Sequence, residues 1–192
     1  MSTTNNVNNV TAGKPRIAGS IYRAATTATA PTSADSSLGS AFKALGYVSE
    51  EGLKNNNSPE TEDIKAWGGD IVMNTLTGKE DRFTFKLIEA LNKDVLAAVY
   101  GSSNVSGDIS TGITVAAKAE QSEAAMYVFD MILNGNVLKR IVVPKATVSE
   151  VSEISYVDNE PVGYEITITA VPDSSGNTHY EYIKQGTPTP QS

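Results

Sequence analysis

Residues 126–133 constrain the fold most, because this segment carries apolar side chains on both faces of an extended chain. One face holds Tyr127, Phe129, Met131 and Leu133, and the opposite face holds Met126, Val128 and Ile132. Such a strand either lies at the centre of a packed structure or turns one face to another subunit. Asn134-Gly135 follows and is the strongest short-range signal for a β-hairpin. The sequence predicts a hairpin that returns through residues 137–143 and stops at Pro144.

Other segments extend this pattern to a mainly β fold. Residues 82–87 alternate strictly between polar and apolar side chains, which is typical of a strand with one face on a core and one face in water. Residues 148–157 and 164–171 are predicted to form a second hairpin with its turn at 158–161. A first strand is expected at 17–23 and a last strand at 180–184.

One helix is predicted after Asn92. Asn92 is a good N-cap, Asp94 lies in the first turn where the helix dipole favours a negative charge, and Gly101 supplies the C-terminal glycine. Leu91 and Leu96 stand at the spacing of a hydrophobic staple. The apolar stripe of Val95, Leu96 and Val99 should place this helix against the sheet. A further turn of helix is expected at 38–44.

The ends of the chain and two internal stretches have little apolar weight. Residues 1–14 and 186–192 are expected to be flexible arms on a single domain at 15–185. The loop at 24–37, rich in Ala, Thr and Ser, is expected not to bury itself. Residues 52–78 form an extended hairpin or loop, and such a long excursion is usually functional or disordered. It contains the only tryptophan, Trp67, which either covers the base of its own hairpin or docks on a neighbouring subunit.

Charge and composition exclude several classes of function. The chain of 192 residues has no cysteine, so disulfides and thiolate metal sites are excluded. Its net charge of −7 argues against a protein that grips nucleic acid, because phosphate binding usually needs a basic excess. We find no signal peptide and no apolar stretch long enough to span a membrane, so the protein is expected in the host cytoplasm before assembly.

No residue pattern indicates catalysis, a cofactor or a metal. His179 is the only histidine, and a catalytic triad or histidine metal centre would need companions that the sequence lacks. Serines stand outside any nucleophile elbow, and neither Gly13-Lys14 nor Gly78-Lys79 continues as a phosphate loop. The acidic pairs at 50–51, 62–63 and 80–81 do not fit a calcium loop and are expected in turns or intersubunit salt bridges. We expect no enzyme.

Three short segments carry a family signature. They are Gly46-Tyr47-Val48-Ser49-Glu50-Glu51-Gly52, Trp67-Gly68-Gly69-Asp70 and Val95-Leu96-Ala97-Ala98-Val99-Tyr100-Gly101. Together they resemble the major tail proteins, or tail tube proteins, of long-tailed non-contractile bacteriophages (siphophages). The resemblance covers about residues 15–171. It implies the tail-tube fold shared with type VI secretion tube proteins, a β-sandwich or half-barrel with one flanking α-helix and a long protruding hairpin or loop.

That resemblance also implies a function and partners. The protein would be a structural virion protein that self-assembles into stacked hexameric rings, forming the tail tube through which DNA is ejected. Its partners would be itself, the tape measure protein, the tail terminator and the distal tail proteins, and double-stranded DNA would pass without specific binding. No immunoglobulin-like decoration domain follows the tube domain in this sequence, a departure from many relatives. The alternative is a monomeric β-sandwich that binds a surface ligand or receptor.

Two sets of residues are candidates for the assembled tube. Trp67, Asp63, Lys65 and Asp70 are predicted to contact the neighbouring ring. Glu150, Ser152, Glu165, Thr167 and Thr169 are predicted to line part of the lumen. An acidic or neutral lining suits transit, because a basic wall would accumulate contacts with phosphates.

Overall fold

The computed structural model describes residues 5–16 and 20–186. Of the predicted first strand, residues 17–19 lie outside this description, as do residues 1–4 and 187–192 of the predicted arms. The strands are β1 (Lys14–Pro15), β2 (Ile21–Ala25), β3 (Lys43–Ala44), β4 (Val48–Lys65), β5 (Ile71–Leu87), β6 (Val105–Asp108), β7 (Gly112–Val115), β8 (Ala125–Leu133), β9 (Val137–Val151), β10 (Tyr164–Ala170) and β11 (Tyr180–Gln185). The helix is α1 (Lys93–Tyr100), and the 3-10 turns are η1 (Val7–Asn9), η2 (Ser102–Asn104) and η3 (Asn134–Asn136).

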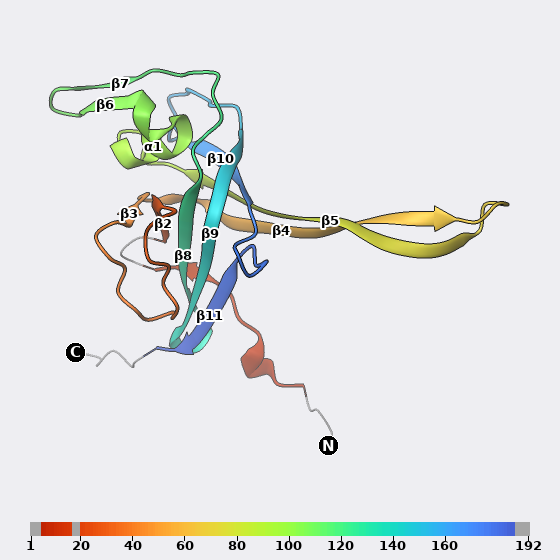
Figure 1. Ribbon diagram of the computed structural model, residues 1–192. Helices are drawn as coiled ribbons and strands as arrows, with labels where there is room; N and C mark the ends of the chain where they lie inside the picture. Colours follow the sequence, from red (N-terminus) through yellow and green to blue (C-terminus); the bar gives the residue numbers. More distant parts are fainter. Residues whose placement is uncertain (1–4, 17–19, 187–192) are drawn as a thin grey trace.

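The main sheet is antiparallel and is built around the hairpin β8–β9. Its strand order is β3-β2-β8-β9-β10-β5-β4, with β1 beside β8 and β11 beside β9 (Figure 1). The predicted central strand and its Asn-Gly turn are therefore confirmed, as is the last strand, β11. β6 and β7, which the sequence analysis did not predict, form a separate two-stranded ribbon near α1.

Pro144 does not end the ladder, contrary to expectation. β9 runs through it to Val151 because the sheet is irregular at that point. Tyr127 pairs with Val143 and Ala125 pairs with Ala146, so β9 has one extra residue opposite β8. On its other edge β9 changes partner there, from β11 to β10. A residue without an N–H is tolerated at such a bulge. The predicted strand at 148–157 is also too long, since residues 152–163 form a connection.

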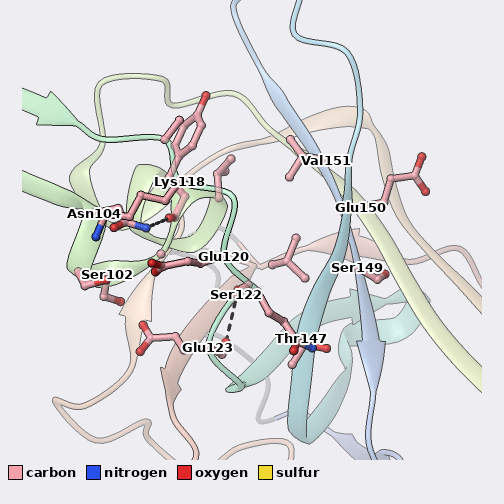
Figure 2. Close-up of a pocket in the computed structure, with 17 residues that line it drawn as sticks. Ser102, Asn104, Lys118, Glu120, Ser122, Glu123, Thr147, Ser149, Glu150 and Val151 are labelled. Atoms are coloured by element: carbon pink, nitrogen blue, oxygen red, sulfur yellow. Dashed lines mark hydrogen bonds between the residues drawn. The ribbon is translucent and has the colours of Figure 1, made fainter.

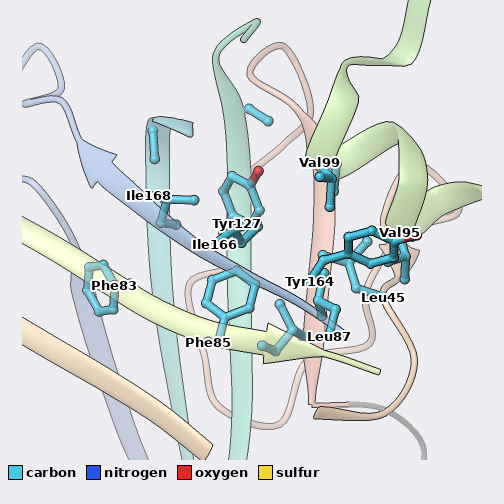
Figure 3. Close-up of a cluster of buried hydrophobic side chains, with 14 of the residues drawn as sticks. Leu45, Phe83, Phe85, Leu87, Val95, Val99, Tyr127, Tyr164, Ile166 and Ile168 are labelled. Carbon is cyan, nitrogen blue, oxygen red and sulfur yellow. The ribbon is translucent and has the colours of Figure 1, made fainter. Parts of the chain in front are cut away.

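The sheet curls over a single large core, as expected for a half-barrel or sandwich. Phe83 of β5 stacks on Phe129 of β8, with ring centroids 5.4 Å apart, although β9 and β10 separate their strands in the sheet. Phe85 packs edge-on against Phe129 at 5.5 Å. Ile166 and Ile168 of β10 belong to the same buried cluster (Figure 3). The alternation predicted at 82–87 is confirmed, because Phe83, Phe85 and Leu87 are all buried.

Helix α1 closes one end of this core. The Asn92 side chain accepts a hydrogen bond from the Asp94 N–H at 2.9 Å, and the Gly101 N–H donates to the Ala97 carbonyl. Val95, Leu96, Ala98 and Val99 are buried, which confirms the predicted helix and its apolar side. The prediction of a hydrophobic staple between Leu91 and Leu96 is wrong, because Leu91 remains largely exposed.

The segment that connects β2 to β3 covers the second face of β8 and β9. Ala30, Leu38 and Phe42 pack there on Met126, Val128 and Val142. The expectation that the loop at 24–37 cannot bury itself is wrong only in part. Ala34 is buried and Ala30 packs on the strands, whereas the other residues at 25–37 are exposed or half-buried. The predicted turn of helix at 38–44 is wrong as well. A turn closed by the Phe42 N–H and the Gly39 carbonyl leads into β3 instead.

A buried ion pair anchors that covering loop. Arg140 is 1% exposed and Asp130 is 3% exposed, and two hydrogen bonds of 2.6 and 2.8 Å join them. The remaining Arg140 amino group donates to the carbonyls of Ser33 and Ser36 at 2.9 and 2.8 Å. The Asp130 backbone N–H donates to the Ser20 carbonyl at 2.7 Å. One pair of charges therefore connects two central strands, the loop and the start of β2.

We expect Asp130→Ala to lower the free energy of unfolding by about 3–5 kcal/mol, because it leaves Arg140 buried without its counter-charge. Denaturant unfolding followed by circular dichroism measures the change. Glu181→Ala is the matched control. Its ion pair with Lys139, 2.9 Å long, is partly exposed, so this loss should be below about 1 kcal/mol. Equal, small losses in both variants would contradict the role assigned to Asp130.

Candidate functional site

The most prominent surface feature is the hairpin formed by β4 and β5. Only its root is part of the packed body, where residues 82–87 of β5 pair with β10. Beyond the root the two strands continue as a ribbon that projects away from the other elements (Figure 1). This confirms a long protruding hairpin, and it shows that residues 52–78 are paired strands joined by a tight turn. A two-stranded ribbon without a layer beneath it is at best marginally stable in water.

The turn at the end of the ribbon presents Trp67 to solvent. The Ala66 N–H donates to the Asp70 carbonyl at 2.8 Å, and the Gly69 N–H donates to the Ala66 carbonyl at 3.0 Å. Gly68 and Gly69 have φ angles of 130° and 99°, which residues with a Cβ rarely adopt. Trp67 is fully exposed, so the interpretation that it covers the base of its own hairpin is wrong.

Apolar side chains surround this turn on both strands. Ile64, Ile71, Val72, Met73 and Leu76 are each between 47% and 63% exposed. We call these five residues with Trp67 the apolar tip. A concentration of exposed apolar side chains on a soluble protein marks an interaction surface. The sequence analysis singled out only Trp67, although the run Ile71-Val72-Met73 could have been noticed in the printed sequence.

The predicted inter-ring residues lie at this end of the hairpin. Asp63 and Lys65 lie at the end of β4 that leads into the turn, and the Asp70 carbonyl closes the turn by accepting from the Ala66 N–H. Asp63 accepts a hydrogen bond from the Asn74 side chain at 2.7 Å. The structure thus brings all four residues together beside the apolar tip. Their contact with a neighbouring ring stays a prediction.

A buried carboxylate fixes the root of the hairpin. Asp81 of β5 is 0% exposed and accepts hydrogen bonds from Asn55 of β4 at 2.8 Å and from Thr178 at 2.6 Å. The Nδ1–H of His179 donates to the same carboxylate, and the imidazole packs edge-on against Phe83. Burial alone would raise the pKa of Asp81, but the hydrogen bonds from Thr178, Asn55 and His179 outweigh it and hold that pKa below its ordinary value. His179 therefore serves as a structural contact between β5 and the start of β11.

The turn that precedes β4 is shaped around another carboxylate. Glu89 accepts hydrogen bonds from the Tyr47 N–H at 2.9 Å and from the Asn92 side chain at 3.0 Å. Gly46 has a φ of 70°, and a Cβ at this position would meet the Glu89 carboxylate at 2.0 Å. This contact explains physically why the segment at 46–52 begins with glycine. It also joins the start of β4 to the start of α1.

The predicted lumen residues share one polar surface of the sheet. Thr167 stands opposite Thr84 on β5 and Glu150 on β9, and the two threonine hydroxyls are 2.9 Å apart. Thr169 donates to the Ser149 hydroxyl, and Ser152 donates to Glu165, each at 2.9 Å. All five candidates lie on the side opposite the core residues Ile166 and Ile168, and Thr167 among them is only 9% exposed. Their place on the wall of a lumen stays a prediction.

Cations stand among these residues, and the sequence analysis did not place them there. Lys86 is opposite Glu165, Arg82 is opposite Thr169, and Lys54 is opposite Thr84. Arg82 also forms an ion pair of 2.8 Å with Glu80. The alternation at 82–87 indicated a solvent-facing side of the strand that carries Arg82 and Lys86. It did not indicate which residues of other strands lie beside that side. The polar surface is therefore mixed in charge, with carboxylates and cations side by side.

A cavity of about 650 Å³ opens between the end of α1, residues 117–123 and β9. Figure 2 shows Lys118 and Glu120 at one side, whereas Glu150 extends from β9 in the opposite direction. Glu123 forms an ion pair of 3.1 Å with Arg23, and hydrogen bonds from Ser102 and Arg23 lower the pKa of Glu123. Within residues 5–16 and 20–186, no group of three or more His, Asp or Glu side chains could hold a metal ion. None of the helices described there is long and apolar enough to cross a membrane.

A family model matches nearly the whole chain. Residues 2–192 match the family described as phage tail tube protein. Among solved structures, the chain resembles the tube-terminating cap of an anti-feeding prophage, determined by cryo-EM, with 13% sequence identity and a TM-score of 0.43. This resemblance covers 88% of the present chain and 91% of the cap chain. A search of curated proteins found no match.

The root of the hairpin should be sensitive to acid. Because the pKa of Asp81 is lower in the folded protein than the unfolded value of about 3.9, its contribution to stability is complete above that value. The contribution is lost as the pH falls through the folded pKa. Asp81→Asn should therefore destabilise the protein by about 1–3 kcal/mol at neutral pH, and this deficit should shrink below about pH 4.

Thermal unfolding at several pH values measures the effect. Asp63→Asn is the control, because Asp63 accepts its hydrogen bond on the exposed part of the hairpin, and its stability should change by less than about 0.5 kcal/mol. A constant deficit of Asp81→Asn at every pH would show that the ionised carboxylate is not the stabilising form.

Proposed function

The chain belongs to the phage tail tube protein family, and we propose that its copies assemble into stacked hexameric rings that form the tube of a long-tailed, non-contractile phage. The family assignment makes the protein a structural component of the virion tail. The finer proposal adds the ring, the stacking and the ejection of DNA through the lumen. It also adds a stage in the host cytoplasm before assembly.

The apolar tip is the observation that carries this proposal. A monomer gains nothing from holding Trp67 and five aliphatic or sulfur-containing side chains in water at the end of a marginal ribbon. Burial of such side chains against a neighbour is favourable, at about 25 cal/mol for each Å² of apolar surface removed from water. A monomeric receptor-binding module would bury this surface only against a foreign partner, whereas tube assembly buries it in every copy.

The edges of the sheet support lateral assembly. In the strand order, β4 and β3 are the last strands, so each has one edge open to pairing. Open edges attract other strands, and joining unlike edges of neighbouring copies closes a ring and removes them. We propose that copies join in this way, with arms at 1–14 and 186–192 connecting one ring to the next. The tape measure, tail terminator and distal tail proteins are the further partners that we propose.

We assign the polar surface of β10, β5 and β9 to the lumen. Glu150 and Glu165 are accompanied by Lys54, Arg82 and Lys86. Because Lys54 is paired with Glu51 and Arg82 with Glu80, the wall would be close to neutral. A wall of balanced charge neither binds phosphates strongly nor repels them. DNA would then slide past Glu150, Ser152, Glu165, Thr167 and Thr169 without specific contacts.

Trp67→Ala should weaken stacking without unfolding the subunit. Loss of a central aromatic anchor typically costs about 2 kcal/mol or more at an interface. Negative-stain microscopy and sedimentation should show fewer or shorter tubes, whereas the thermal midpoint of the free variant should match the wild type. Leu91→Ala, a change at another exposed apolar residue outside the hairpin, serves as the control and should form normal tubes. The proposed function would be contradicted if wild-type protein stayed monomeric at high concentration even in the presence of a tail initiator complex.

Glu150→Lys with Glu165→Lys should permit assembly but slow the ejection of DNA. The two added cations would give the wall an excess of positive charge and create contacts with phosphates. The delay should shrink as the salt concentration rises, because counterion release weakens. Fluorescence of a DNA dye during triggered ejection measures the rate, and Glu181→Lys on β11 is the control. Unchanged kinetics in tubes that contain both lysines would show that this surface faces elsewhere or that wall charge does not govern transit.

A further inference from the structure

We propose that the apolar tip of one copy inserts into a groove of a second copy formed by residues 13–16, residues 44–53 and strand β8. This inference rests on the proposed assembly and deepens it, because it names the surface that receives the hairpin. The occupant is the described segment around Trp67, and the receiving partner is another copy of the same chain.

The groove is a concave and mostly apolar surface of about 760 Å³. Its lining includes Ile21 together with Phe129 and Met131 of β8. On one side β1 pairs with β8 at Met131 and Ile132, and on the other side the chain passes through Val48 and Leu53 of β4. Tyr47, which also lines the groove, is 74% exposed. A concavity of this size is within the range that holds compact apolar ligands.

The chemistry of the groove matches that of the tip better than the other cavity does. The cavity beside α1 is lined by many polar and charged residues, among them Lys118, Glu120 and Glu123. Aliphatic side chains inserted there would strip water from charged groups, which is costly. In the groove, the same side chains would contact carbon atoms of Val48, Leu53 and Met131, which are partly exposed.

Charges at the rims are complementary. The hairpin end carries Glu62, Asp63 and Asp70 beside the apolar tip, against the single cation Lys65. The groove has Lys14 and Arg16 along its N-terminal side. Three carboxylates line the groove. Asp130 is already paired with Arg140 and, at 3.7 Å, with Arg16. Glu89 already accepts hydrogen bonds from Tyr47 and Asn92, which leaves Glu50 on the side away from Lys14 in sequence. Attraction between unlike charges favours one orientation of the tip and disfavours wrong partners.

The tip cannot occupy the groove of its own chain. β4 starts at the groove, where Val48 and Leu53 line it, and then runs outward to Lys65 (Figure 1). At about 3.3 Å per residue, the distance from Leu53 to the tip is on the order of 40 Å. A surface that meets a different surface on the next copy makes a heterologous contact, which continues from copy to copy. Insertion of the tip would therefore link copies in series at a spacing of that order.

Cysteine crosslinking tests the contact directly, because the chain contains no cysteine of its own. Met73→Cys in the tip is combined with Tyr47→Cys in the groove, and both positions are more than half exposed in the free subunit. Mild oxidation of assembled protein should give a ladder of covalent multimers on a denaturing gel. The control combines Met73→Cys with Lys118→Cys in the cavity beside α1 and should give no ladder. Each single variant should also stay monomeric on the gel.

Charge exchange gives a second measurement that does not depend on disulfide geometry. Lys14→Glu alone and Asp63→Lys alone should each reduce assembly, and the double variant should regain it. Tubes that crosslink through Lys118→Cys but not through Tyr47→Cys would contradict the proposed groove contact. So would a double charge variant that assembles no more than either single variant. Both outcomes would leave the proposal of tube assembly intact. Wild-type protein that never polymerises would overturn both proposals.

Discussion

Asp130 and Arg140 face each other directly across the central strands β8 and β9, where almost no water reaches them. Removing two charges from water is costly, and the cost is recovered only when every remaining donor and acceptor is satisfied. The loop between β2 and β3 provides the missing acceptors through the carbonyls of Ser33 and Ser36. A loop of small polar residues therefore becomes a structural layer, and β8 and β9 can be apolar on both faces without exposing either.

With its centre secured in this way, the molecule separates into a packed body and a projecting hairpin. The body buries Phe83, Phe85 and Phe129 against one another, and the end of the hairpin leaves Trp67 in water. Asp81 stands at the boundary and ties both hairpin strands to residues 178–179. The body thereby sets the direction in which the hairpin points. In a repeating assembly, the direction of such a projection determines where the next copy lies.

The sequence predicted the β class, the central hairpin, the helix and the strands whose signals are local. Asn134-Gly135 and the cap at Asn92 specify their own conformation, whatever surrounds them. Predictions that depend on distant partners failed. Pro144 is accommodated by a bulge opposite β8, and the loop at 24–37 is held against the sheet because Arg140 binds the Ser33 and Ser36 carbonyls. Among the site residues, Trp67 was evident as a lone aromatic, but the cations beside Glu165 and the groove are created only when strands far apart in sequence come together.

The unsupported length of the hairpin also has a consequence for dynamics. Stability along a ribbon falls with distance from the core that supports it, so local opening becomes easier from Asp81 towards Trp67. Backbone amides near the tip of a free subunit would exchange with solvent quickly, while those near the root exchange only when the sheet itself opens. The tip would then become ordered only when the subunit associates with another copy. The first contact between two free subunits must restrain a mobile hairpin, and this loss of conformational entropy opposes early polymerisation. A later subunit that binds a hairpin already restrained in the assembly avoids that loss.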